Sequence, residues 1–416
     1  MTTTAAAWQT GVGVRAEPFI LPALLVISAL GFNAALAIIN AHVTGLTSGS
    51  VIICEFAIVV GAQLLALSHY RQEMDAWYVL AGLLTVFALL RSVATQALEP
   101  KLLRDVLLIP TFTVLGMVSD RRRLNQLVLA IHAIVIAFLL LEMSSPAFYS
   151  DLLKIQSYYV QTRGFQTGDF WNTNSVLFIS ATRPEQRFFP FFDLHRMSSI
   201  FLEPVSLGNY CVTIAAFLCA RWHTLGTASK WFLIAGNVVA IVGCDGRFAA
   251  VACGAIAVLA FVAARLPRRS TVLYLPVITG MVLAAVLLGG LQVGADDFSG
   301  RIAFTADLLS RFDVQDFLGI SDRYMKLAVD SGLAYFIVTQ SIIGLCAVWL
   351  FVVYASAEAR MEQVRYNHAL CLYVSLLLMV SYALFTIKTA ALLWFIHGCL
   401  QKKRIEPLFT PRMKIA

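Results

Sequence analysis

Residues 20–39 read ILPALLVISALGFNAALAII, a run without a single acidic or basic side chain. A helix needs about 20 apolar residues to cross the hydrocarbon core of a bilayer. Similar runs recur along the 416-residue chain, which is 59% hydrophobic and 13% charged, with a mean hydropathy of +0.78. Soluble globular domains carry roughly twice that charged fraction. The sequence therefore predicts an all-α polytopic membrane protein.

The apolar runs predict a single integral membrane domain over residues 1–416 with about 12 transmembrane helices. We place these helices at residues 18–39, 49–69, 76–96, 102–118, 124–143, 205–221, 230–244, 247–264, 271–291, 332–354, 367–385 and 387–400. Two long loops remain, at residues 144–204 and 292–331. Loops of this length are usually functional, and we expect short helices within them, for example around residues 146–160.

Alternate connections are short and basic, which predicts that they face the cytoplasm together with both termini. They contain Arg71, residues 120–123, Arg221 with Lys230, Arg265 with residues 268–269, Arg360 with Arg365, and residues 402–404. The two long loops and the turn at residues 243–247 then face outward. In a membrane protein the net charge of +7 reflects this orientation and contact with anionic lipid, so we expect no nucleic-acid partner.

The eight cysteines lie in or beside apolar runs and form no C-x-x-C pair. No His and Cys residues cluster at the spacing of metal ligands. We interpret the cysteines as small buried hydrophobic residues and expect neither a metal site nor a cofactor.

Basic residues on the outward side stand near the starts of predicted helices. Arg196 precedes the sixth predicted helix, Arg247 begins the eighth, Asp330 precedes the tenth, and Arg301 lies in the second long loop. Helix N-termini favour anions, and guanidinium groups bind phosphate oxygens in pairs. The pattern predicts a phosphate or diphosphate site. The alternative is that each arginine binds lipid headgroups or helix-end carbonyl groups at the membrane interface.

Four sequence elements on this side resemble those of bacterial O-antigen and exopolysaccharide polymerases and O-antigen ligases. Residues 195–204, HRMSSIFLEP, are similar to the family's Arg-x-x-(Gly/Ser)-x-Phe-x-(Glu/Asp)-Pro element. Residues 246–250, GRFAA, resemble its Ser-Arg-Gly-Ala turn, with Gly246 in place of serine. Gly300-Arg301 with residues 317–320, and residues 330–332 with Gly344, are similar to two later elements. The resemblance covers about residues 190–350.

The resemblance implies a GT-C-like glycosyltransferase with two long periplasmic loops in the bacterial inner membrane. Its active site would face the periplasm and use no metal. The partners it implies are an undecaprenyl-diphosphate-linked oligosaccharide donor and acceptor, the lipid bilayer and a chain-length regulator protein. Ligases carry histidine where this chain has Asp330, so the resemblance favours a polysaccharide polymerase. An O-antigen ligase that acts on lipid A core, and a transporter or flippase of lipid-linked oligosaccharide, are the alternatives.

In this interpretation Arg196, Arg247 and Arg301 bind the diphosphate and stabilise its charge. Asp330 is the candidate general base for the acceptor hydroxyl, or alternatively the N-cap of the following helix. Substrate contacts are expected from His195, Glu203, Arg323 and Tyr324, although His195 is also typical of a polar loop residue and Glu203 of a first helical turn before proline. The aromatic residues between Phe165 and Phe192 stack on sugar, hold the prenyl chain or line the membrane interface.

Three ionisable side chains fall within predicted helices, namely Glu55, His132 and Lys388. Ionisable groups in a membrane suggest function by default. These three lie in distant helices without a paired pattern, so buried hydrogen-bonded or interfacial roles are favoured over a proton pathway. Asp105 and Glu142 lie near helix ends and are assigned no special role.

Overall fold

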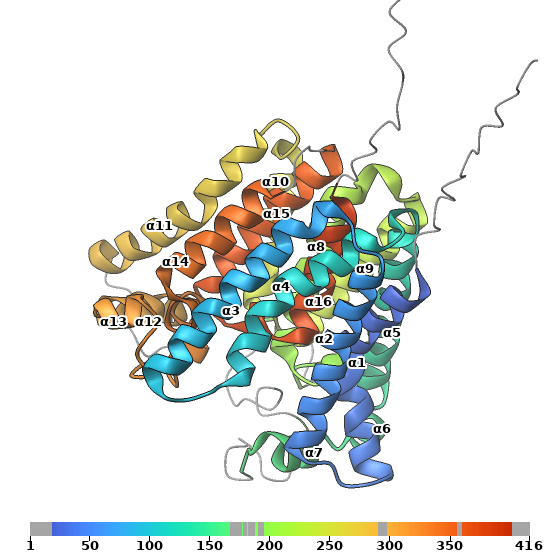
Figure 1. Cartoon of the computed structure of the whole chain (residues 1–416). Coiled ribbons are helices and arrows are strands. Elements are labelled where there is room, and N and C mark those ends of the chain that lie inside the picture. The colour runs from blue at the N-terminus through green and yellow to red at the C-terminus, as the bar shows by residue number, and fades with distance from the viewer. Residues whose placement is uncertain are drawn as a thin grey trace, which may run out of the picture.

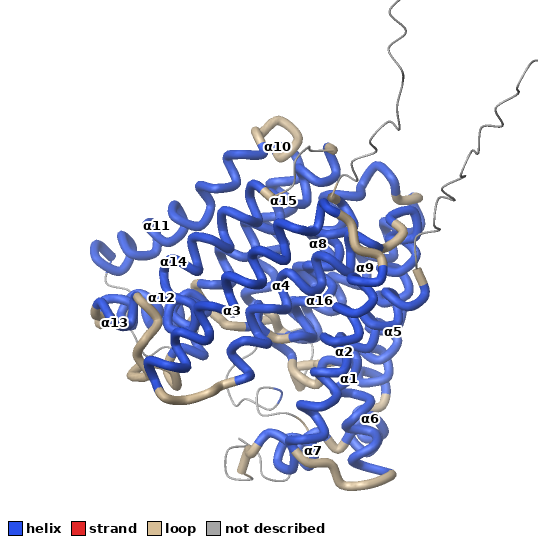
Figure 2. Tube along the Cα trace, in the orientation of Figure 1, coloured by secondary structure: helices blue, strands red, loops and turns tan. Residues whose placement is uncertain are grey.

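The computed structural model describes residues 19–166, 177, 181, 188–189, 195–289, 298–355 and 360–401. Over these residues the chain forms helices joined by turns and loops, and no strand (Figure 2). Both termini, and most of the aromatic run that ends at Phe192, lie outside the described residues.

Helices occur at all twelve predicted stretches (Figure 1). They are α1 (Ile20–His42), α2 (Ser48–Ser68), α3 (Asp75–Thr95), α4 (Pro100–Val118), α5 (Leu124–Ser144), α8 (Pro204–Arg221), α9 (Thr227–Cys244), α10 (Arg247–Val262), α11 (Tyr274–Gly289), α14 (Gly332–Tyr354), α15 (Met361–Leu378) and α16 (Ile387–Leu400).

Eight helical segments in the described part of the chain are long and apolar enough to cross a membrane, those that contain α1, α2, α3, α5, α8, α9, α11 and α14. The helices α10 and α16 are apolar but shorter, and α4 and α15 carry charges near their starts. A multi-pass helical membrane protein is confirmed at this level. The full number of twelve spans remains a prediction.

The predicted helix at residues 367–385 is the least accurate, because α15 begins at Met361 and ends at Leu378. The chain turns after Leu378 where the start of α14 packs closely against it. A Cβ atom on Gly332 would lie 2.3 Å from the carbonyl oxygen of Ser381. A helix continued to residue 385 would need this space.

Contacts between connections agree with the predicted sorting into two sides. Arg121 and Arg221, from two connections assigned to the cytoplasm, both form ion pairs with Glu362 at the start of α15. Arg268 donates to the carbonyl oxygen of Val353 at the end of α14 (2.8 Å). These four connections therefore lie on one side of the bundle. We call the opposite side the outer side, as predicted.

The centre of the bundle is the pair α4 and α16. Every residue of α16 is buried. A Cβ atom on Gly398 would lie 1.9 Å from the carbonyl oxygen of Thr113, and one on Gly116 would lie 2.2 Å from that of Phe395. Small residues let membrane helices approach closely, so these two glycines allow the central pair to form.

The two long loops contain the expected short helices. The first loop forms α6 (Pro146–Leu153), α7 (Ile155–Arg163) and the 3₁₀ helix η5 (Ser199–Phe201); the second forms α12 (Phe298–Ser310), α13 (Val314–Phe317) and η8 (Ala328–Asp330). The helices α6 and α7 lie at one end of the bundle, beside α1 (Figure 1). The predicted helix around residues 146–160 is thus confirmed.

Candidate functional site

The segment that carries His195 and Arg196 is held by Glu142, a fully buried residue near the end of α5. The Glu142 carboxylate accepts hydrogen bonds from the backbone N–H groups of Ser198 (2.9 Å) and Ser199 (2.8 Å). Its Oε1 atom lies 2.9 Å from Nε2 of His195. Glu142 was assigned no role from the sequence, and that was wrong, because it positions this loop. His195 in turn is fixed by a carboxylate.

Arg196 and Arg247 lie at the same turn, between α9 and α10. The backbone N–H of Met197 donates to Gly243 (3.0 Å), and Nε of Arg196 donates to the carbonyl oxygen of Cys244 (3.1 Å). Asp245 follows in the left-handed conformation with φ 51°, and Arg247 is the first residue of α10. Two of the three predicted diphosphate ligands, 51 positions apart in sequence, thus lie at one turn between two helices.

Arg301 lies in α12 and contacts the outer end of α15. Its Nη1 atom donates to the carbonyl oxygen of Val380 (3.4 Å). Tyr373 of α15 contacts the ring of Phe248, the residue after Arg247, with ring centroids 6.2 Å apart. Val380 stands seven positions after Tyr373, which corresponds to about 10 Å along a helix. Arg301 is therefore placed on the same side of the bundle as the turn with Arg196 and Arg247, against a neighbouring helix end.

Asp330 ends η8 and its side chain is exposed. The N-cap of α14 is Ser331, whose hydroxyl accepts a hydrogen bond from the N–H of Ala334 (3.2 Å). The alternative role of Asp330 as the helix cap is thus wrong, because the next residue occupies that position. An exposed carboxylate at the outer end of α14 remains compatible with a general base.

Tyr324 and Arg323 stabilise the second loop. The ring of Tyr324 stacks on Phe312 with centroids 5.4 Å apart, and its hydroxyl donates to the carbonyl oxygen of Arg311 (3.3 Å). The exposed guanidinium of Arg323 lies 4.8 Å from the Tyr324 ring centroid. Tyr324 is buried, so its contacts explain it as a packing residue, and of the two only Arg323 is accessible to a substrate.

Arg91, near the outer end of α3, fastens the second loop to α14. It donates to the carbonyl oxygens of Ser321 (2.9 Å) and Val338 (3.1 Å) and forms an ion pair with Asp322. The helix α14 is broken at Ser341, which has φ 67° and ψ 165°. A helix break frees backbone groups near it for other partners. Here the carbonyl oxygen of Val338 accepts a hydrogen bond from Arg91.

Six charged side chains from five segments form a second cluster on the outer side, which we call the outer charge belt. Its members are Glu55 of α2, Arg104 and Asp105 of α4, Arg163 of α7, Glu203 before α8, and Lys388 of α16. Arg104 forms ion pairs with Glu55 and Asp105, Arg163 lies 3.3 Å from Glu55, and Lys388 pairs with Glu203.

Hydrogen bonds to neighbouring elements extend both sets of ion pairs in the belt. The hydroxyl of Tyr335 in α14 donates to Asp105 (2.7 Å). The hydroxyl of Tyr159 donates to Glu203 (2.8 Å), one turn of α7 away from Arg163. Lys388 also donates to the carbonyl oxygen of Phe201 in η5 (3.4 Å), in the segment that begins at Arg196. The belt and the α9–α10 turn are thus joined by residues 196–203.

The sequence pointed to the belt only in part. Glu55 and Lys388 stood out as ionisable groups within predicted helices, and their expected buried, hydrogen-bonded roles are confirmed. His132 agrees too, because it is buried and its Nδ1 lies 3.0 Å from the Tyr210 hydroxyl. Asp105 was assigned no role, which was wrong. Apart from the neighbours Arg104 and Asp105, no sequence pattern pairs these residues, since the other partners come from distant segments.

The pKa values of Arg163 and Glu203, and of the tyrosines beside them, indicate which of these groups are charged at neutral pH. Burial raises the pKa of Tyr158 to about 12 and that of Tyr159 well above its usual value. Burial alone would lower the pKa of Arg163, but Glu55 raises it overall. Burial opposes ionisation of Glu203, yet Lys388 and three hydrogen bonds lower its pKa. At neutral pH the belt therefore presents charged Arg163 and Glu203 beside neutral tyrosine hydroxyls.

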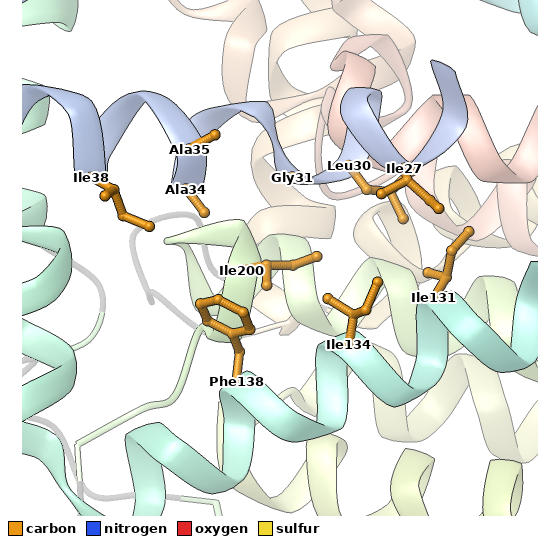
Figure 3. Close-up of a pocket in the computed structure, with 10 residues that line it drawn as sticks. All are labelled: Ile27, Leu30, Gly31, Ala34, Ala35, Ile38, Ile131, Ile134, Phe138 and Ile200. Carbon is orange, nitrogen blue, oxygen red and sulfur yellow. The ribbon is translucent and has the colours of Figure 1, made fainter. Parts of the chain in front are cut away.

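An apolar cavity of about 210 Å³ lies between α1 and α5, and Ile200 of η5 reaches into it (Figure 3). Its walls are aliphatic side chains of both helices with the ring of Phe138. Among the described residues, no group of three or more His, Cys, Asp or Glu side chains is arranged to hold a metal ion.

The chain was compared with protein-family models, curated proteins and solved structures. None of the three comparisons gives a match to this chain.

Proposed function

We propose that this protein is a polysaccharide polymerase of the bacterial inner membrane, with both termini in the cytoplasm and its active site at the periplasmic face. It transfers an undecaprenyl-diphosphate-linked glycan onto the next lipid-linked repeat unit. The proposal includes twelve spans and a GT-C-like architecture. The observation that carries it is that Arg196, which donates to the carbonyl oxygen of Cys244, and Arg247, which begins α10, lie at the same turn between α9 and α10.

The chemistry needs little beyond charge stabilisation and positioning. A lipid diphosphate is already a good leaving group, and guanidinium groups beside a helix N-terminus stabilise the charge that develops on it. Asp330, exposed before α14, accepts the proton of the attacking hydroxyl. The aliphatic cavity is lined in part by Ile200, which stands four residues after Arg196 in the sequence. This cavity suits the first isoprene units of the same lipid. Each of these assignments depends on the arginine pair.

The test is the length of the polysaccharide in cells that carry single substitutions at equal protein levels. Replacing Arg247 by alanine removes one charge-stabilising group and is expected to slow polymerisation about 100-fold, which leaves single repeat units. Arg247→Lys is expected to be defective as well, because lysine lacks the planar fork. The matched control is Arg311→Ala, since Arg311 is exposed and pairs only with Asp307 of its own helix turn among the described residues.

Three outcomes would contradict the proposal. Long polymer made by both Arg247→Ala and Asp330→Ala would overturn the site. Long lipid-linked polymer that fails to reach lipid A core in a deletion strain would indicate a ligase. Repeat units confined to the cytoplasmic leaflet in that strain would indicate a flippase.

A further inference from the structure

The outer charge belt differs from the arginine pair in how its charges are balanced. Three cations, Arg104, Arg163 and Lys388, contact three anions, Glu55, Asp105 and Glu203. The charges within these pairs cancel, and Lys101 near Asp105 adds a single positive charge, so the cluster gives little net attraction for a diphosphate. It still offers many strong hydrogen-bond donors and acceptors.

The belt has a buried layer and an accessible layer. The side chains of Glu55, Asp105 and Lys388 are at most 7% exposed, whereas those of Arg163, Glu203 and Arg104 are 33%, 24% and 20% exposed. The buried layer holds the accessible one in place through the ion pairs. Fixed, partly exposed charged groups are preorganised for a ligand that hydrogen-bonds to them.

Arg163 has hydrogen-bonding capacity left for such a ligand. Within the described part of the chain, both of its hydrogen bonds, to Asn33 and Glu55, use Nη2. A guanidinium group has five N–H donors, so Nε and Nη1 remain available. Arg163 also ends α7, next to the left-handed residue Gly164.

Aromatic rings adjoin the accessible layer. Phe165 lies 5.9 Å from the ring of Tyr159, which donates to Glu203. Tyr382 is half-buried beside Tyr335, which donates to Asp105, and the Lys101 ammonium lies 5.7 Å from its ring centroid. Apolar ring faces beside fixed polar groups suit a ligand with a polar edge and an apolar face.

We propose that the outer charge belt binds uncharged sugar residues of the lipid-linked repeat unit. This inference rests on the proposed function and assigns the glycan to the belt and the diphosphate to Arg196 and Arg247. Sugar hydroxyl groups both donate and accept, so they match guanidinium and carboxylate groups side by side, and the C–H face of a sugar ring packs on an aromatic ring. Residues 196–203 connect the two sites and set their separation.

The test uses the full-length protein in lipid nanodiscs and two soluble probes. One is the repeat-unit oligosaccharide released by mild acid from the lipid-linked pool of the native host, which carries no phosphate. The other is inorganic pyrophosphate. Binding of each is measured by calorimetry or saturation-transfer NMR for the unmodified protein and for Arg163→Gln, Arg247→Ala and the control Arg311→Gln.

Arg163→Gln is expected to weaken oligosaccharide binding at least tenfold and to leave pyrophosphate binding unchanged. Arg247→Ala is expected to do the reverse. If the single variant folds poorly because Glu55 loses a partner, the double variant Glu55→Gln with Arg163→Gln is used in its place. The double variant removes one charge of each sign. Oligosaccharide binding that persists in a folded Arg163 variant, or that is absent in the unmodified protein, would overturn the inference.

The failure of this inference and that of the proposed function give different results. Normal polymer in a deletion strain, with sugar binding that depends on Arg163, would refute the polymerase and retain the sugar site. Polymer that depends on the protein, with sugar binding indifferent to Arg163, would retain the polymerase and refute the belt assignment.

Discussion

The two long outer loops are held to the bundle by groups of opposite charge. In the first loop, the carboxylate of Glu142 accepts from the backbone N–H groups of Ser198 and Ser199. In the second loop, the guanidinium of Arg91 donates to backbone carbonyl oxygens. In each case one buried charge satisfies several backbone groups that have no partner in regular structure.

The two loops differ in which backbone groups would lose their hydrogen-bond partner if Glu142 or Arg91 were replaced. Loss of Glu142 would leave buried N–H groups, each with a single hydrogen, without an acceptor. Loss of Arg91 would leave carbonyl oxygens, which tolerate a missing bond better, and Asp322, whose side chain is 49% exposed. The first loop should therefore be the more sensitive to its anchor, and the following substitutions test that order.

The largest effect is expected for Glu142→Ala. Two buried N–H groups and His195 lose their acceptor, which should lower the free energy of unfolding by about 3–5 kcal/mol. The measurement is chemical unfolding in mixed micelles. Glu142→Gln keeps one acceptor oxygen and should cost clearly less. Equal stability of Glu142→Ala and the unmodified protein would show that the first loop is held by other contacts.

An intermediate effect is expected for Arg91→Ala. Its carbonyl partners and Asp322 lose their donor, at a cost of about 2–4 kcal/mol in the free energy of unfolding. Asp322→Asn serves as the comparison and should cost less than about 1 kcal/mol, because its ion pair is half open to solvent. If the two variants cost the same in an unfolding titration, the backbone contacts of Arg91 contribute nothing and the contrast between the loops disappears.

The smallest effect is expected for Gly319→Ala. Gly319 has φ +71°, and a Cβ atom there would lie 2.8 Å from the backbone nitrogen of Ser341 at the break in α14. Left-handed backbone costs roughly 1–2 kcal/mol for a residue with a side chain, so the melting temperature should fall. Gly82→Ala is the control, because nothing lies within 4 Å of its Cβ position. A melting temperature unchanged in both variants would mean that the loop does not pack tightly into the break.

Helix positions were largely predictable from the sequence. The stretch at residues 332–354 coincides with α14, and residues 124–143 end one residue before α5 does. A membrane helix can be recognised from a local run of apolar residues, so its prediction does not require knowledge of the helices that pack against it. The break at Ser341 inside α14 leaves no such trace, and the groups packed near it, Gly319 and Arg91, come from elsewhere in the chain.

The sequence by itself determined the class of protein, the helices and the side of the bundle on which basic residues gather, because these follow from local composition. The tertiary structure decided which charges meet. Lys388 and Glu203 stand 185 positions apart, and Arg104 and Glu55 are 49 apart. A charge in an apolar setting must be paired, but many arrangements of twelve helices would pair it. The packing of those helices around α4 and α16 selects one of them.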